Sequence, residues 1–450
     1  MRAFRARALT VAGSDSGGGA GIQADLKTFA ALGVHGMCAI TAITAQNTVG
    51  VYAVQDVDVE VIRSQIRVVA EDIGVDAVKT GMLHTSQIIE AVAEELSKLS
   101  KPIVVDPVMV AKSGAELLKQ DAVKSLIEKM LPIATVLTPN ALEASKLVGF
   151  AVKTLEDAKR AARAIAEMGP RAVVVKGGHI LSEKSVDTLY YDGEVRLIES
   201  PRVNTKNTHG TGCVFASAIA AEMAKGADIL SAVSTAKQFV LSAIKKGTSI
   251  GKGHGPVNPS ASVYEAAMKF EALECLKEAV RMLESNPAVA RLIPESQSNI
   301  AMAIPYAESR EEVVAIPGRM VRLPWGVRAS GCPEFGASRH VADAILTVME
   351  YNPNVRAAMN VRLGEDVLDA VRSLNLSVSR YDRRLEPEEV KRAEGMSVRW
   401  GMSQAVKLHG GVPNVVYHEG DWGKEPMVTV FGRDAVEVAS LVIRLAEKIR

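Results

Sequence analysis

The stretch Lys206-Asn207-Thr208-His209-Gly210-Thr211-Gly212-Cys213 joins a polar segment to an apolar run over residues 214–223 that predicts a buried helix. Small residues stand where this helix begins, so the backbone there can approach a ligand closely. The first N–H groups of a helix have no internal partners and lie at the positive end of the helix dipole. An anion such as a transferring phosphoryl group therefore fits this turn.

Cys213 falls within the first turn of the predicted helix. A thiol at a helix N-terminus loses its proton more readily, so Cys213 is a candidate base toward a substrate hydroxyl, or a group that lies beside that hydroxyl. Taken in isolation, the same residues are explained by a glycine-rich capping turn with a packed cysteine. The balance shifts because a second glycine-rich turn, over residues 13–21, joins the first predicted strand to the first predicted helix.

This second turn lacks the Gly-Lys-Ser/Thr of a P-loop. It matches the dinucleotide fingerprint only loosely, because no acidic residue ends a strand about 20 positions later to hold a ribose. Its glycines instead allow the backbone to wrap a small planar ligand, with Asp25 and Gln46 reading the polar edge of that ligand.

Short β-rich runs alternate with longer amphipathic runs as far as about residue 262. This alternation predicts an α/β fold, an open parallel sheet with helices on both faces. The predicted strands cover 8–12, 38–44, 76–80, 103–106, 134–138 and 172–176, followed by a hairpin over 186–198. The predicted helices cover 20–32, 59–73, 86–99, 121–131, 154–168, 214–223 and 229–246.

Ligands of such sheets bind beyond the carboxyl ends of the strands, where this chain carries polar residues. Asp106 is a candidate for the metal or phosphate side, and Lys176 is a candidate phosphate ligand because a buried lysine is rare without a partner. Asn140 and Glu143 lie three apart at a helix start, which suits a hydrated Mg²⁺. An Asn cap with Glu at the third helical position explains the same pair without a metal.

The charges nearly balance, with 53 Lys and Arg against 52 Asp and Glu and a net charge of +1. Such a chain has no general attraction to nucleic acid or to anionic membranes, so neither is expected as a partner. No apolar stretch approaches the ~18 residues of a membrane span. The four cysteines lack Cys-x-x-Cys or zinc spacing, which suits a reducing cytoplasm.

The chain divides after a Gly- and Pro-rich loop over 247–259. We predict a first domain over 1–262, a helical linker over 263–285 and a second domain over 286–450, which is again α/β with strands over 357–363, 377–381, 414–417 and 427–431. Several arginines of this domain lie close together in the sequence, and arginine suits a bidentate grip on phosphate. Solvated arginines beside a capping Ser338 explain the same cluster without a ligand. The arginines of this domain cluster at Arg319, Arg322, Arg328 and Arg339, with His340.

Together, the motifs of the first domain resemble the hydroxymethylpyrimidine/phosphomethylpyrimidine kinases, a thiamine-biosynthesis family of the ribokinase-like superfamily. The resemblance spans nearly all of residues 8–250. It implies a ribokinase-like parallel-sheet domain that phosphorylates hydroxymethylpyrimidine with ATP, and then its monophosphate to the diphosphate. The motifs are 13–27, Ala45-Gln46-Asn47-Thr48, Lys79-Thr80-Gly81-Met82-Leu83, Val105-Asp106-Pro107-Val108-Met109, Thr138-Pro139-Asn140, Lys176-Gly177-Gly178-His179 and 207–213.

The resemblance implies ATP and Mg²⁺ as cofactors and gives roles to individual residues. Cys213 stands where sugar kinases of the superfamily carry an Asp base, and it would take or guide the hydroxyl proton beside the backbone of Gly210 and Gly212. The other implied contacts are Lys176, Thr208 and Thr211 with the ATP phosphates, Asp106, Asn140 and Glu143 with Mg²⁺, and Gly13, Asp25, Gln46 and Met82 with the pyrimidine.

In the second domain, Gly318-Arg319-Met320 and Gly336-Ala337-Ser338-Arg339-His340 resemble the thiamine-phosphate synthase domain found fused to this kinase, mainly in archaea. The resemblance covers about 290–445 and implies a three-layer α/β/α fold. The implied reaction joins the pyrimidine diphosphate to thiazole phosphate and releases pyrophosphate. Arg319 and His340, followed by Arg339, would stabilise the leaving diphosphate or position the thiazole phosphate.

Two other functions fit these residues. The second domain also resembles a ligand sensor of repressors, so a kinase with a thiamine-phosphate-sensing module is an alternative to a bifunctional enzyme. Pyridoxal is a similar planar heterocycle with a hydroxymethyl group, so pyridoxal kinase activity is another. Both families tend to form dimers, and we expect a cytoplasmic homodimer or higher homo-oligomer that acts on small-molecule substrates.

Overall fold

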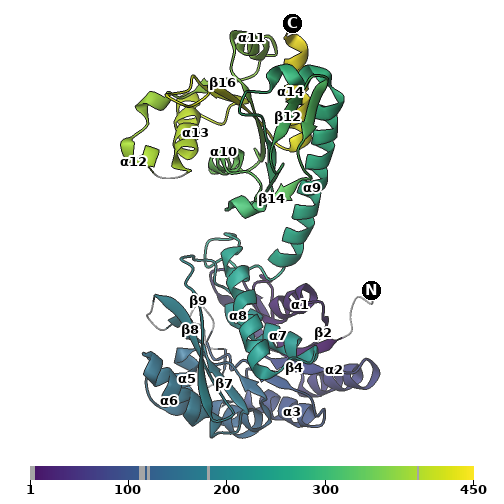
Figure 1. The fold of residues 1–450 in the computed structure, drawn as a ribbon. Helices are drawn as coiled ribbons and strands as arrows, with labels where there is room; N and C mark the ends of the chain where they lie inside the picture. The colour runs from purple at the N-terminus through teal and green to yellow at the C-terminus, as the bar shows by residue number, and fades with distance from the viewer. Residues whose placement is uncertain (1–5, 111–116, 119–121, 180–182, 393–394, 450) are drawn as a thin grey trace. The chain divides into compact units, whose positions relative to one another are not determined.

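The computed structural model describes residues 6–110, 117–118, 122–179, 183–392 and 395–449. The chain forms two compact units, Met1–Val263 and Tyr264–Arg450 (Figure 1). Each unit is built around its own sheet.

Among the described residues of the first unit, nine strands form one sheet, in the order β3-β2-β1-β4-β5-β6-β7-β8-β9. The six strands from β2 to β7 in this order run parallel, whereas β3 at one edge and the β8–β9 hairpin at the other are antiparallel. The strands are β1 (Arg7–Asp15), β2 (His35–Gln46), β3 (Val51–Asp56), β4 (Ala77–Thr80), β5 (Ile103–Val105), β6 (Val136–Leu137), β7 (Ala172–Val175), β8 (Lys184–Tyr191) and β9 (Glu194–Pro201).

Helices cover both faces of this sheet because successive strand residues point to opposite sides. Leu9 and Val78 pack into one core, whereas their neighbours Ala8 and Ala77 pack into the other. The helices of the first core are α2 (Val59–Asp72), α3 (Ser86–Ser97), α4 (Ala122–Ser125), α5 (Ala141–Val148) and α6 (Leu155–Ala166). Those of the second are α1 (Gly21–Ala31), α7 (Thr211–Ala224) and α8 (Ile229–Lys245).

The predicted α/β architecture is confirmed, with local differences. Strand β3 was not predicted, because its edge position leaves most of its side chains exposed and removes the hydrophobic signal. The helix predicted over 121–131, whose first residue lies outside the described residues, is broken into α4, a π-helical turn over Leu126–Met130 and a 3₁₀ turn over Leu131–Ile133. Pro132 in that turn cannot supply the N–H that a continuing helix needs.

The second unit is a three-layer α/β/α sandwich, as predicted. Its seven-stranded sheet has the order β14-β11-β10-β15-β18-β17-β16 and is antiparallel except for the β16–β17 pair. These strands are β10 (Ile300–Ala303), β11 (Val313–Ala315), β14 (Glu334–Phe335), β15 (Ala357–Arg362), β16 (Val378–Arg380), β17 (Val415–His418) and β18 (Met427–Gly432). A separate hairpin pairs β12 (Met320–Leu323) with β13 (Gly326–Ala329).

Successive side chains along these strands again point to opposite faces of the sheet and so contribute to two separate cores. Met302 and Met359 face α9 (Ala261–Ser285), α11 (Glu365–Ser373) and α14 (Ala435–Lys448), whereas Ala301 and Ala358 face α10 (His340–Met349) and α13 (Met396–His409). Strands β10 to β14 were not predicted, because they are short and lie in the proline-broken part of the chain. The remaining α-helix of the described residues is the short α12 (Glu388–Arg392).

The segment predicted as a linker over 263–285 falls, apart from Val263, in the second unit. It lies within α9, and Ala272, Leu276 and Leu283 of this helix are buried in the core of the second unit. Helical periodicity predicted the helix itself, but it could not show that the apolar face of α9 packs against the sheet of the second unit.

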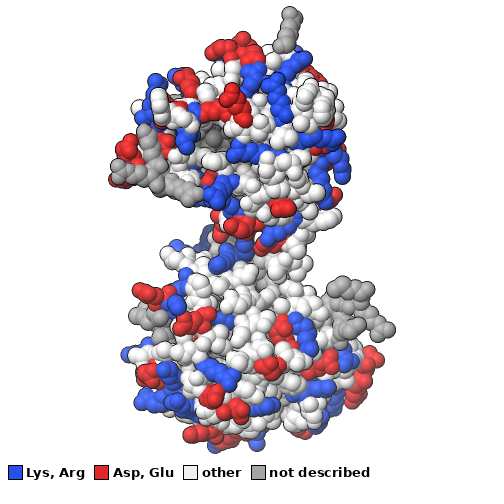
Figure 2. Space-filling model, in the orientation of Figure 1, with Lys and Arg blue, Asp and Glu red and all other residues white. Residues whose placement is uncertain are grey.

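The surface agrees with the nearly balanced charge. Figure 2 shows Lys and Arg mixed with Asp and Glu over the visible face of each unit. Within the described residues, no helix has the length and apolar character needed to cross a membrane.

Candidate active site

The parallel strands bring the predicted polar positions to one edge of the first sheet. β1 ends at Asp15, β2 ends at Gln46, and β5 is followed directly by Asp106. Asn140 and Lys176, which follow β6 and β7, form a parallel bridge with each other. Carboxyl ends of parallel strands share an edge, so the sequence placed this rim correctly.

The two glycine-rich turns meet at this edge. Gly210 is the N-cap of α7 and has a φ of 80°, a conformation that disfavours a side chain. A Cβ atom at Gly210 would lie 1.9 Å from the carbonyl oxygen of Gly19. Glycine is therefore required for the contact between the turns, which sets the N-terminal ends of α1 and α7 side by side.

His209 links the same turns through its side chain, and no role was predicted for it. Its Nε2 lies 3.0 Å from Oδ2 of Asp15 and 3.4 Å from Nε2 of Gln46. Burial raises the pKa of Asp15, but hydrogen bonds from His209 and the N–H groups of Ala20 and Gly17 outweigh burial, so the pKa is lowered. No local sequence pattern reveals this pair, because Asp15 and His209 come from turns that are far apart in the chain.

Cys213 is the third residue of α7 and so lies in the first helical turn, where the sequence placed it, but its thiol is not acidic. Burial is the largest influence and raises the pKa to about 11, against a smaller lowering by the positive charge of Lys79. The N–H of Gly21 also lowers the pKa by donating to the sulfur. The expectation of an easily ionised thiol is therefore wrong for the free protein, because desolvation outweighs the helix N-terminus.

Asp25 does not line the edge where a ligand binds. Its side chain is fully buried, and it forms a 2.7 Å ion pair with Lys79, which is also fully buried. The Thr10 hydroxyl donates to the same carboxylate over 2.7 Å and the Ser217 hydroxyl over 2.6 Å. With its oxygens engaged in this way, Asp25 acts as the internal counter-ion of Lys79, which corrects its predicted contact with the pyrimidine.

Lys176 has a carboxylate partner within the protein. Its Nζ lies 2.8 Å from Oδ1 of Asp106, which also accepts from the Thr138 hydroxyl over 3.3 Å. Burial lowers the pKa of Lys176, but the charges of Asp106 and Glu143 outweigh burial and raise it, so the ammonium stays charged. A Cβ atom at Gly212 would lie 3.3 Å from this Nζ, so the first turn of α7 lies directly against the Lys176–Asp106 pair.

Asn140 and Glu143 form the capping box that was the alternative to a metal site. The Asn140 side-chain oxygen accepts from the N–H groups of Leu142 and Glu143, both over 2.9 Å, and Glu143 accepts from the Asn140 N–H over 2.7 Å. Both lone pairs of the Asn140 oxygen are thus in use, so it is removed from the predicted metal ligands.

Asp106 and Glu143 still suit a cation that keeps most of its water. Burial, together with the nearby charge of Asp106, raises the pKa of Glu143 to about 7. Two such carboxylates fit Mg²⁺, which takes few protein ligands beside substrate phosphates. A dedicated cage is absent: no cluster of three or more His, Cys, Asp or Glu side chains suited to a metal occurs in the described parts of the chain.

The remaining predicted residues of the first unit lie around the two turns. Gly13 packs against Met82, whose sulfur would lie 3.2 Å from a Cβ atom at Gly13. The Thr211 hydroxyl donates to the Thr208 carbonyl over 2.7 Å and so closes the turn before α7.

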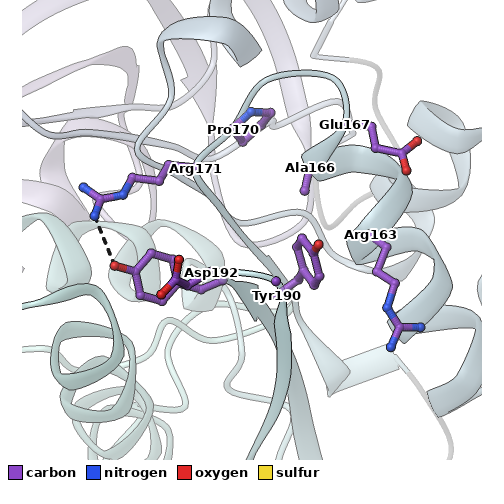
Figure 3. Close-up of a pocket in the computed structure, with 9 residues that line it drawn as sticks. Arg163, Ala166, Glu167, Pro170, Arg171, Tyr190 and Asp192 are labelled. Atoms are coloured by element: carbon purple, nitrogen blue, oxygen red, sulfur yellow. Dashed lines mark hydrogen bonds between the residues drawn. The ribbon is translucent and has the colours of Figure 1, made fainter.

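A surface pocket of the first unit lies away from this edge. It is lined by Arg163 of α6, by Arg171 before β7 and by the turn between β8 and β9 (Figure 3). Arg171 donates to the Tyr191 hydroxyl over 3.1 Å. Arg163 and Arg171 precede β7, and Tyr191 pairs with Ala172, the first residue of that strand. Lys176 follows the last residue of β7, so the pocket lies at the opposite end of the strand.

In the second unit, the charge of Arg319 acts on His340. Burial lowers the pKa of His340, and the positive charge of Arg319 lowers it further. Arg319 has a φ of 78°, which is uncommon for a side-chain-bearing residue, and it donates to the Ser296 carbonyl.

Arg339 is the N-cap of α10, so the alternative of a capping Ser338 is wrong. Arg328 instead pairs with Glu284 over 2.9 Å.

Two families match this chain in consecutive segments. Residues 15–258 match phosphomethylpyrimidine kinase, and residues 275–444 match thiamine-phosphate synthase ThiN. The hydroxymethylpyrimidine/phosphomethylpyrimidine kinase of Bacillus subtilis is 49% identical over 254 residues, which cover 56% of this chain and 94% of the relative. The bifunctional thiamine biosynthesis protein ThiED of Geobacter sulfurreducens is 48% identical over 255 residues, 56% of this chain and 52% of the relative.

A solved structure supports the fold of the first unit. The ADP complex of Bacillus subtilis pyridoxal kinase is 43% identical, with a TM-score of 0.55, and the match covers 57% of this chain and 98% of that one. The kinase match alone spans more than half of the sequence. The chain therefore belongs to the phosphomethylpyrimidine kinase family and carries, in the same polypeptide, a thiamine-phosphate synthase domain.

Proposed function

We propose that the first unit transfers phosphate from ATP to hydroxymethylpyrimidine and then to its monophosphate. The second unit then joins the diphosphate to thiazole phosphate and releases pyrophosphate. One observation carries the kinase proposal: the first turn of α7, with Cys213, lies against the Lys176–Asp106 pair at the ligand-binding edge of the sheet. Phosphoryl transfer depends mainly on positioning and charge neutralisation, which this arrangement supplies.

Lys176 and the first N–H groups of α7 would hold the transferring phosphoryl group, beside Gly210, Gly212 and the Thr208–Thr211 turn. Asp106 and Glu143 would hold Mg²⁺, which neutralises phosphate charge when bound. On binding the cation, Glu143 would lose the proton that its raised pKa favours. The N–H of Gly21 and the charge of Lys79 would support the Cys213 sulfur from the other side.

Cys213 would lie beside the substrate hydroxyl and orient it. A thiol with a pKa of about 11 keeps its proton at neutral pH, so it is not a preformed base. A loose transition state needs little proton transfer before the phosphoryl group moves, which suits an orienting role. Gln46, Met82 and Gly13 would contact the pyrimidine, and His209 would fix the Gln46 amide through its contacts with Gln46 and Asp15.

The experiment that tests the proposal is mass spectrometry of one reaction with full-length protein, hydroxymethylpyrimidine, thiazole phosphate, ATP and Mg²⁺. We expect thiamine phosphate. Accumulation of the pyrimidine diphosphate alone would refute the synthase and favour a sensing module, whereas unchanged pyrimidine would refute the kinase. Arg319→Ala and His340→Ala should each stop condensation and leave the kinase step intact.

Pyridoxal phosphorylation is a second candidate for the same site. It is favoured by the 43% identity to a solved pyridoxal kinase over nearly the whole length of that enzyme. Competition between pyridoxal and hydroxymethylpyrimidine for phosphorylation decides between them: pyridoxal that neither reacts nor inhibits would exclude this activity.

A further inference from the structure

The segment that follows β7 is held by hydrogen bonds on both sides. The N–H of Lys176 donates to the Pro139 carbonyl over 2.9 Å. The N–H of the next residue, Gly177, donates to Oδ1 of Asp187 over 2.8 Å. The Lys176 side chain carries the ammonium that lies 2.8 Å from Asp106. The position of this ammonium therefore depends on the backbone that these two hydrogen bonds fix.

Strand pairing brings Asp187 beside this segment. β7 and β8 run antiparallel with Val175 opposite Thr188, so Asp187, the residue before Thr188, lies beside the residues that follow β7. Gly177 is buried there, and a Cβ atom on it would lie 1.8 Å from the Val186 carbonyl oxygen. The backbone at Gly177 thus packs directly against β8, with no room for a side chain between them.

The other oxygen of Asp187 is anchored by a helix. Oδ2 lies 2.9 Å from Nζ of Lys237 in α8, and the side chains of Asp187 and Lys237 are only 6% and 7% exposed. Lys237 also donates to the Ser185 hydroxyl over 2.9 Å. Ala236 and Val240 of the same helix are buried in the second core of the first unit, so packing holds Lys237 in a fixed position.

The ion pair also compensates the charge that Asp187 would otherwise add beside a phosphate. A bare carboxylate close to Lys176 would repel ATP, but the ammonium of Lys237 offsets it. What remains for the segment after β7 is a directional acceptor, because a hydrogen bond weakens steeply when the N–H turns away. Asp187 thus fixes the orientation of the Gly177 peptide without adding net charge to the ligand-binding edge.

We propose that Asp187 is a positioning residue of the kinase, which fixes Gly177 and thereby holds Lys176 against the first turn of α7. This inference rests on the proposed role of Lys176 in holding the ATP phosphates. Catalysis by positioning tolerates little error, since a displacement of about 1 Å can cost about 100-fold in rate. Neither Asp187 nor Lys237 belongs to a motif of the sequence analysis, because β8 and α8 meet the segment after β7 only on folding.

Two double variants isolate this hydrogen bond. Asp187→Asn/Lys237→Met removes both charges but keeps an oxygen that can accept from the Gly177 N–H. Asp187→Leu/Lys237→Met removes the same charges and has a side chain of nearly the same shape without an acceptor. Replacing a buried ion pair with apolar groups of similar volume is often tolerated. The two proteins differ at position 187 alone, so any effect of losing Lys237 or the ion pair is common to both.

The test is steady-state kinetics of the full-length chain, with ATP and hydroxymethylpyrimidine varied separately. We expect the KM for ATP to be about tenfold higher in Asp187→Leu/Lys237→Met than in Asp187→Asn/Lys237→Met, because a buried N–H without an acceptor is costly and the segment moves to satisfy it. The KM for hydroxymethylpyrimidine should be the same in both. A merely structural role would lower the folded fraction, and so kcat, without changing the KM for ATP.

A matched control lies in the same hairpin. Lys184 and Glu199 form an ion pair with 64% and 48% exposed side chains, so Glu199→Gln should keep the KM for ATP within about twofold of the wild type. An equal KM for ATP in the two double variants would overturn the proposal. If Asp187→Leu/Lys237→Met does not fold, Asp187→Ala/Lys237→Met takes its place, and a KM equal to that of Asp187→Asn/Lys237→Met again overturns it.

Binding of the non-hydrolysable ATP analogue AMP-PNP, measured by calorimetry, separates this inference from the proposed function. If the wild type binds AMP-PNP but leaves hydroxymethylpyrimidine unphosphorylated, the proposed substrate is wrong, whereas weaker AMP-PNP binding in the Leu variant than in the Asn variant still supports the positioning role. Phosphorylation with equal AMP-PNP affinities in the two variants refutes the positioning role alone. A wild type that does not bind AMP-PNP refutes both.

Discussion

Replacing Asp25 with Asn tests whether this residue supports the fold or contacts the substrate. In the structure, the Asp25 carboxylate and the Lys79 ammonium are fully buried 2.7 Å apart. Asn removes the negative charge and leaves the ammonium without its counter-ion. Breaking a buried pair in this way costs about 3–5 kcal/mol. We therefore expect a large loss of stability in the first unit.

The pH dependence of this loss follows from Lys79. Burial lowers the pKa of Lys79, but the charges of Asp25, Cys213 and Asp106 outweigh burial and raise it in the wild type. Without Asp25, burial should prevail and depress the folded-state pKa below that of the unfolded chain. The unfolded state then binds more protons, so the stability of Asp25→Asn should recover as pH rises above neutrality.

The assay is urea denaturation followed by two signals. Trp325, Trp400 and Trp422 are the three tryptophans of the sequence and all belong to the second unit, so their fluorescence reports on that unit, whereas circular dichroism reports on both. The loss should appear in the dichroism transition and leave the tryptophan transition unchanged. Asp25→Asn/Lys79→Met, which removes both charges, should recover much of the stability.

A matched control uses an exposed pair of the same chemistry. Lys184 and Glu199 also lie 2.7 Å apart, but their side chains are 64% and 48% exposed. Glu199→Gln should leave the unfolding curve nearly unchanged, because water screens such pairs. The reasoning is refuted if Asp25→Asn unfolds like the wild type and only raises the KM for hydroxymethylpyrimidine, since Asp25 would then contact the substrate.

Three further predictions concern Glu143 and Cys213. The folded-state pKa of Glu143 is raised to about 7, so its stabilising contribution is fully present below the unfolded-state pKa of about 4.3 and is lost as pH rises to about 7. The free energy of unfolding should change by on the order of 3 kcal/mol over this range. Glu143→Gln should flatten this part of the stability curve of the metal-free protein, and identical curves for the variant and the wild type would contradict the burial argument. Cys213, with a pKa of about 11, should react with iodoacetamide at pH 7.5 roughly two orders of magnitude more slowly than a thiol with a pKa of about 8.5. Peptide mass spectrometry over a pH series measures that rate, and half-maximal labelling below pH 9 would disprove the raised pKa. Cys213→Ala should depress kinase turnover without unfolding the chain, and unchanged turnover would remove Cys213 from the site.

The sequence by itself determined the architecture of the first unit and the position of its rim. Alternating strand and helix signals require a parallel sheet, and parallel strands place their carboxyl ends at one edge, so Asp106, Asn140 and Lys176 had to meet. The sequence also predicted the turns before α1 and α7, because each contains several glycines directly before a helix. In the second unit, the motifs around Arg319 and His340 were visible, but the order of its mixed sheet was not.

Only the tertiary structure decided what each side chain faces. Leu9 and Val78 point to one face of the sheet, so their strand neighbours Thr10 and Lys79 point to the other face, which α1 and α7 cover. Asp25 of α1 therefore meets Thr10 and Lys79 in the interior of the protein. Burial then reversed the expected acidity of Cys213. Periodicity and motifs report on neighbours along the chain, whereas burial and charge depend on neighbours in space, which this sequence brings together only on folding.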